Sequence, residues 1–297
     1  MADMVDARAA GAIYDLGYQP YTGPRFGRWY AVRTLISYSF ATVFGVGRGD
    51  KAKTIPTLIV ALVYLPALVQ VGVASATGVA ALIQYSTYLE FTAFLIALFA
   101  AAQAPELIVT DKQQGVLSLY LSRPLKATDY AAAKLVALVL AMLVITLGPQ
   151  LLLLLGRIFL GASPMAVVKT EWTKLFPIVG GTVMTSVFVA SIAMLLASFA
   201  SRRGYGTASV IVFFLLAPAL VDMFRAVTAG ALKRYSVLAH PVYLISGFAN
   251  WLFDIEARRR SAVGRADLPG PYYLYVMAAV SIVCIAALLR RYRRLDA

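Results

Sequence analysis

The chain has 297 residues, of which 61% are hydrophobic and 14% are charged, and its mean hydropathy is +0.77. Soluble globular chains contain about 45–50% apolar and about 25% charged residues, so this composition excludes a soluble domain as the bulk of the protein. The net charge of +13 is not arranged as a basic stripe with interleaved aromatic residues on a polar domain, so we expect no nucleic-acid partner. The sequence predicts an integral membrane protein.

The N-terminal segment, residues 1–54, is the first predicted unit. It begins with a stretch rich in Asp, Gly and Pro and lacks the apolar core of a cleavable signal peptide. Further on, apolar side chains recur at steps of three and four residues: Trp29, Val32, Ile36, Phe40 and Val43. This pattern, with Arg28 and Arg33 on other faces, predicts an amphipathic helix that lies in the membrane interface.

Six apolar segments follow, each long enough to cross a hydrocarbon core of about 30 Å as a tilted helix. They are Ile55–Ala74, Leu82–Ala104, Tyr130–Leu155, Phe176–Phe199, Thr207–Val227 and Tyr272–Leu289. The apolar stretch Pro241–Phe253 is too short to cross, so it predicts a re-entrant or interfacial element before the last span. The predicted fold is therefore all-α, with a transmembrane domain at 55–289 and a basic tail at 290–297.

An even number of spans places both termini on the same side of the membrane. Arginines are dense in the tail, at Arg290, Arg291, Arg293 and Arg294, and at the Arg202-Arg203 turn. Because short loops rich in Lys and Arg stay in the cytoplasm, we expect both termini to be cytoplasmic. The predicted location is the inner, or plasma, membrane.

Motifs for chemistry within the chain are absent from the sequence. No G-x-x-x-x-G-K-[ST] phosphate loop occurs, so we expect the chain itself to bind neither ATP nor Mg²⁺ through one. His240 and Cys284 are the only residues of their types, which are too few for a usual transition-metal site. We expect no cofactor, no metal and no catalytic residues.

The segment between the second and third spans is unusually apolar for a loop. A charged turn at Asp111 and Lys112 leads into a short apolar stretch, which Arg123 and Pro124 end, because proline disfavours helix in the residue before it. An apolar surface on the cytoplasmic side is unfavourable in water. The loop is therefore expected to contact a protein partner or the membrane surface.

This loop resembles the cytoplasmic loop of ABC type-2 transporter permeases, the membrane-spanning subunits of bacterial ABC exporters. The family's pattern is an acidic residue, a glycine, a short apolar helix, a proline and a lysine that opens the next helix. The matching positions here are Glu106, Gly115, Pro124 and Lys134. The six spans, the amphipathic helix before them and the short element before the last span also resemble that family.

The resemblance implies a permease that is powered by separate ATPase subunits, which carry the phosphate loops and bind ATP and Mg²⁺. It also implies a second permease copy or homologue as partner, and a hydrophobic or amphipathic substrate such as a lipid or drug, which is exported. The loop would be a coupling helix that docks on the ATPase. The residues implied in coupling are Glu106, Gly115, Leu117, Leu119, Tyr120, Pro124 and Lys134.

Glu90 lies about 10 Å inside the second span, where a carboxylate normally faces a cavity or a partner. It is a candidate for the substrate path, or for a structural ion pair with Arg157, Arg225 or a neighbouring chain. Other functions remain open at this point. A secondary transporter or channel would show coupling-ion residues or internal repeats, and a membrane scaffold would need neither.

Overall fold

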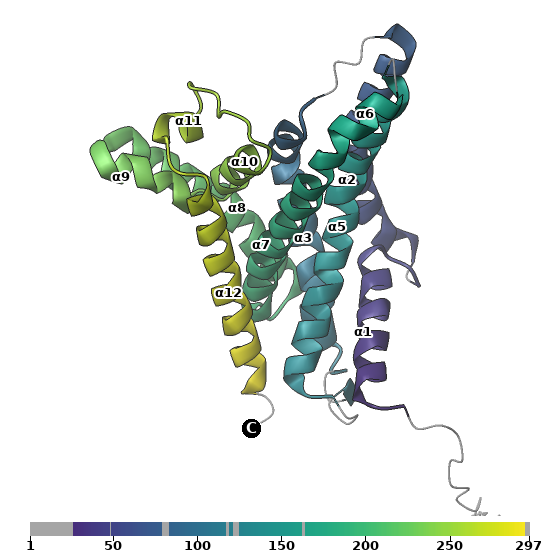
Figure 1. Cartoon of the computed structure of the whole chain (residues 1–297). Helices are drawn as coiled ribbons and strands as arrows, with labels where there is room; N and C mark the ends of the chain where they lie inside the picture. The colour runs from purple at the N-terminus through teal and green to yellow at the C-terminus, as the bar shows by residue number, and fades with distance from the viewer. Residues whose placement is uncertain are drawn as a thin grey trace, which may run out of the picture.

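The computed structural model describes residues 26–47, 49–78, 83–116, 119–120, 125–161 and 164–294, with only the backbone for residues 50–52. All regular elements within these ranges are helices. Figure 1 shows them as a bundle of long helices, with several short helices gathered at the end opposite the C-terminus. The all-α prediction is confirmed.

Six helices are long and apolar enough to cross a membrane, which confirms the predicted spans. They are α2 (Asp50–Thr77), α3 (Tyr85–Gln113), α5 (Ala127–Leu160), α7 (Leu175–Phe199), α8 (Arg203–Val227) and α12 (Pro271–Arg293). A short helix, α6 (Pro164–Glu171), and one 3₁₀ turn lead directly into α7. Most residues of α3 and α7 are buried, whereas α2, α8 and α12 lie at the perimeter.

Several polar side chains within the buried helices form hydrogen bonds to a neighbouring helix or to the preceding turn. The hydroxyls of Thr146 and Ser186 lie 3.2 Å apart and join α5 to α7. The Thr182 hydroxyl donates to the carbonyl of Ile178, one turn earlier in α7. Small polar residues of this kind allow helices to approach closely in a membrane without leaving donors unsatisfied.

Helix α3 continues past Pro105 to Gln113, although the sequence predicted an end at Ala104. Proline costs a helix one hydrogen bond, but packing from neighbouring helices compensates for such breaks in a membrane bundle. Helix α8 supplies this packing. A Cβ atom at Gly206 would lie 2.9 Å from the Cβ of Pro105, so glycine allows α8 to approach α3 here.

The amphipathic helix predicted near the N-terminus is present as α1 (Arg28–Val43). Figure 1 shows α1 standing alongside α5 and not across the end of the bundle. The expectation that α1 lies in the membrane interface stays a prediction. The residues Leu35, Ser39 and Thr42 are buried. Their spacing shows that one face is covered, but only the tertiary structure shows that α5 is its main neighbour.

The short element predicted before the last span is confirmed as α10 (Pro241–Leu252), which packs against α3, α7 and α12. It begins at His240, whose Nδ1 accepts a hydrogen bond from the N–H of Tyr243 at 3.2 Å. Two shorter helices, α9 (Gly230–Tyr235) and α11 (Ala262–Ala266), accompany it. All three lie at the end opposite the C-terminus (Figure 1).

Candidate functional site

The coupling loop begins at a glycine cap on α3. Gly115 has a φ of +66°, and its N–H donates to the carbonyl of Lys112 at 3.3 Å. The N–H of Val116 donates to the carbonyl of Asp111 at 3.2 Å. These two hydrogen bonds form a Schellman motif, which ends a helix with one residue in the left-handed region. Glycine is therefore favoured at position 115 for its backbone conformation, and the cap turns the chain sharply out of α3.

The described part of the loop contains the start of a helical turn. The N–H groups of Leu119 and Tyr120 donate to the carbonyl of Val116 at 3.1 and 3.2 Å. The Leu119 side chain is 66% exposed. Tyr120 instead points into the bundle, where its ring centroid lies 5.6 Å from that of Tyr130. The two residues predicted to dock together therefore face in different directions.

Two further predicted coupling residues, Leu117 and Pro124, lie outside the described residues. The expectation that they belong to the docking surface stays a prediction.

Lys134 is deeply buried, with 2% of its side chain exposed. Its Nζ lies 2.8 Å from Oδ2 of Asp111, and the Tyr130 hydroxyl donates to the same oxygen at 2.7 Å. The Nζ also lies 5.5 Å from the centroid of the Tyr130 ring. Lys134 thus joins α5 to α3 directly below the glycine cap, through a buried ion pair.

Glu106 was expected in the loop, but it lies within α3 and is 5% exposed. Its Oε2 is 2.5 Å from Nη1 of Arg203, the first residue of α8. Glu106 therefore joins α3 to α8 and does not contact the loop helix directly. Sequence reasoning missed Arg203 as its partner, because two residues so far apart in the chain show no periodic relation.

Additional contacts connect this end of the bundle. The Nζ of Lys112 donates to the carbonyl of Ser198 at 2.7 Å, at the end of α7, and lies 5.6 Å from the centroid of the Tyr292 ring in α12. Arg28 of α1 pairs with Asp129 of α5 at 2.6 Å. We call this set the charged base: Arg28, Glu106, Asp111, Lys112, Asp129, Tyr130, Lys134 and Arg203. It lies at the same end as the C-terminus (Figure 1) and joins α3 to α5, α7, α8 and α12, and α1 to α5.

Glu90 and Arg157, the other predicted site residues, are not brought together. Glu90 is exposed on α3, and within the described part of the chain no ion pair or hydrogen bond reaches its carboxylate. Arg157 lies 3.9 Å from Glu171, and it donates to the carbonyl of Ile83 at 2.9 Å. The ion pair between Glu90 and Arg157 that the sequence suggested is therefore absent here, since α6 brings Glu171 to the end of α5.

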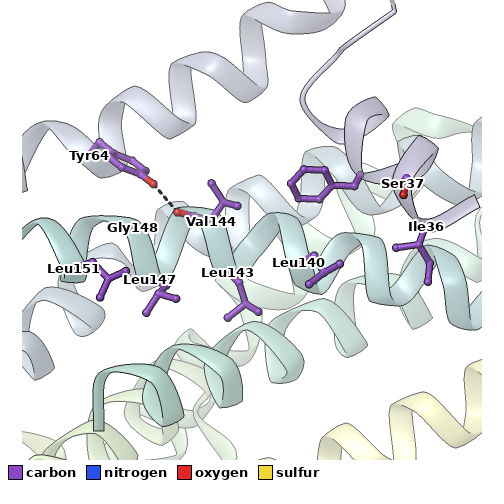
Figure 2. A pocket seen from close by; sticks show the side chains of 10 residues that line it. Ile36, Ser37, Tyr64, Leu140, Leu143, Val144, Leu147, Gly148 and Leu151 are labelled. Carbon is purple, nitrogen blue, oxygen red and sulfur yellow. Dashed lines mark hydrogen bonds between the residues drawn. The ribbon is translucent and has the colours of Figure 1, made fainter. Parts of the chain in front are cut away.

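An apolar groove of about 620 Å³ opens on the side of the bundle between α1, α2 and α5. Figure 2 shows Tyr64 at one edge, with its hydroxyl donating to the carbonyl of Val144 at 2.6 Å. A Cβ at Gly148 would lie 1.8 Å from the Tyr64 oxygen, so glycine makes this contact possible. Apart from Ser37 and Tyr64, the lining side chains are aliphatic or aromatic hydrocarbons or glycine. The groove could hold an apolar chain.

Among the residues that the structure describes, no three His, Cys, Asp or Glu side chains gather as metal ligands. Six apolar spans around a buried core define a multi-pass membrane protein. The polar contacts at the C-terminal end join helices to one another.

Comparison with known families agrees with this architecture. The family described as ABC-2 family transporter protein matches residues 28–296. The chain therefore belongs to the ABC-2 transporter family and is a membrane transport subunit that is distinct from the ATPase. No curated protein gives a significant match to the sequence.

Proposed function

We propose that this chain is the permease subunit of an ABC exporter whose energy comes from separate ATPase subunits that bind ATP and Mg²⁺. The observation that carries the proposal is the exposed apolar side chain of Leu119, held on a helical turn directly outside the charged base. Exposed apolar residues on a short loop indicate a protein contact. In a transport subunit of this family, the ATPase is the partner that such a contact would serve.

The charged base would transmit ATPase motion into the spans. A displacement of the loop would move Asp111 at the end of α3. The Asp111–Lys134 ion pair would transmit this displacement to α5. The Glu106–Arg203 pair passes the motion of α3 to α8. Buried ion pairs resist separation because an unpaired charge in an apolar setting is costly. The helices around the loop would therefore move together.

The proposed substrate is hydrophobic or amphipathic, such as a lipid or drug, and would leave the cytoplasm or the inner leaflet. The apolar groove beside Tyr64 supports this class, because it opens to the side of the bundle, where an apolar molecule could enter from the membrane. Polar substrates would find few hydrogen-bond partners along its walls.

A second permease copy or homologue would complete the path. Glu90, Phe91 and Phe94 form an exposed strip on α3, whose other faces are mostly buried. A carboxylate at this position in a span favours a partner chain or a water-filled path over lipid. We propose that this strip faces the second copy. The charge distribution supports cytoplasmic termini and a plasma-membrane location.

Co-purification with the ATPase tests the proposal. Leu119→Asp should insert and accumulate normally but lose the ATPase and its stimulated turnover, because it would bury a charge at the contact. Tyr205→Asp is the matched control, since Tyr205 is also exposed, at the start of α8, and should keep the ATPase bound. Normal association and transport in Leu119→Asp would rule out docking through this turn.

A further inference from the structure

Two hollows adjoin the short helix α9, at the end of the bundle opposite the charged base. One has a volume of about 360 Å³ and is lined by charged side chains: Arg225, Lys233, Arg234, Arg265 and Asp267. The other has a volume of about 450 Å³ and is apolar, with Leu220, Phe224, Leu232 and Tyr235 in its walls. Figure 1 shows α9 as an outlying part of the molecule, beyond the end of α8.

The charged hollow carries a surplus of positive charge, with four cations against one carboxylate. Two of the four cations form hydrogen bonds to backbone carbonyls of residues that line the hollow. Arg225 donates to the carbonyl of Lys233 at 3.2 Å, and Nε of Arg234 donates to the carbonyl of Ala266 at 2.8 Å. The other two, Lys233 and Arg265, are exposed, and among the described residues neither is seen to form an ion pair. They are free to bind an anion.

The apolar hollow lies along the last two turns of α8, which end at Val227. Its walls are unusually exposed, since Leu232 is 66% and Tyr235 51% accessible. These two side chains are three apart on α9 and share one face, whereas Lys233 and Arg234 line the charged hollow. Helix α9 thus separates an apolar surface at the end of a span from a basic surface just beyond it.

We propose that this corner, formed by α8, α9 and α11, binds a phospholipid with an anionic headgroup. The headgroup phosphate would contact Lys233 and Arg265, and an acyl chain would lie along Leu220 and Leu232. Charge complementarity selects the headgroup, because basic residues at a membrane surface attract anionic lipids. The adjoining apolar hollow at the end of a span favours a lipid over a free anion, since a free anion would leave that surface uncovered.

Lipid binding to the purified full chain in detergent tests the proposal. The probes are dioleoylphosphatidylglycerol, dioleoylphosphatidylcholine of the same chains, and glycerol 3-phosphate as the headgroup alone. The double variant Lys233→Gln/Arg265→Gln should bind phosphatidylglycerol roughly 25-fold more weakly, at about a fivefold loss for each cation removed. The matched control Arg259→Gln/Arg260→Gln removes two exposed arginines that do not line the hollow and should bind as the wild type does.

A second variant tests the acyl chain. Leu232→Ser should weaken binding of phosphatidylglycerol and leave the response to glycerol 3-phosphate unchanged. The proposal fails if the Lys233→Gln/Arg265→Gln variant and its control bind phosphatidylglycerol equally, or if phosphatidylcholine binds the wild type as tightly as phosphatidylglycerol. Equal affinity for glycerol 3-phosphate and phosphatidylglycerol would show a site for a free anion, and would also overturn it.

Discussion

Replacing Lys134 with methionine would leave the Asp111 carboxylate without the cation that lies 2.8 Å from it. Only 2% of the Lys134 side chain and 15% of the Asp111 side chain are exposed, so water cannot readily replace the lost partner. Breaking a buried pair from one side costs about 3–5 kcal/mol. Because Asp111 is less buried than Lys134 and keeps the Tyr130 hydroxyl as a donor, we expect a cost near the lower limit, about 3 kcal/mol.

Removing both charges should cost less than removing one. In Lys134→Met/Asp111→Asn, the amide can still accept a hydrogen bond from Tyr130, and neither charge of the pair remains. Side chains in one network show interaction energies of about 0.5–3 kcal/mol in double-mutant cycles. We therefore expect the double variant to recover roughly 2 kcal/mol of the loss.

The assay is reversible unfolding of the purified protein in mixed micelles, for the wild type, both single variants and the double variant. Stimulation of the partner ATPase by the same four proteins would show whether stability and coupling change together. An interaction energy below about 0.5 kcal/mol, the lower limit for contacting residues, would refute the reasoning. The pair would then be a consequence of packing and would not hold α3 and α5 together.

Three further predictions can be checked by thermal melting. Gly115→Val should destabilise the end of α3 by roughly 1–2 kcal/mol, because valine is strained at a φ of +66°, whereas Gly115→Asn should cost less. Gly148→Ala and Tyr64→Phe should each lower the melting temperature, but their effects should not add, since both remove the bond between Tyr64 and the carbonyl of Val144. Burial lowers the pKa of His240, so the folded state binds fewer protons than the unfolded state, and stability should fall as the pH drops below about 6.5. His240→Gln should flatten this pH dependence; an unchanged slope would assign the titration to another group.

The sequence by itself determined the class of protein and most of its elements. Long apolar segments must satisfy their own backbone hydrogen bonds in lipid, so length and composition were enough to identify all six spans. The short length of Pro241–Phe253 correctly separated α10 from the spans. Gly115 was identified as part of the loop pattern, and local backbone geometry explains its place at the end of α3.

Only the tertiary structure decided which partners the predicted site residues contact. The sequence predicted that a span ends just before Pro105 and Glu106. In the structure α8 packs closely against α3 there, α3 continues beyond both residues, and Arg203 pairs with Glu106. Leu119 and Tyr120 are both bulky residues of the same short apolar stretch. In the structure Leu119 is exposed, whereas the ring of Tyr120 packs against Tyr130. Periodicity shows which face of a helix is apolar. It cannot show which neighbour lies there, because ion pairs and close helix contacts join residues that are far apart in the chain, and only tertiary packing brings them together.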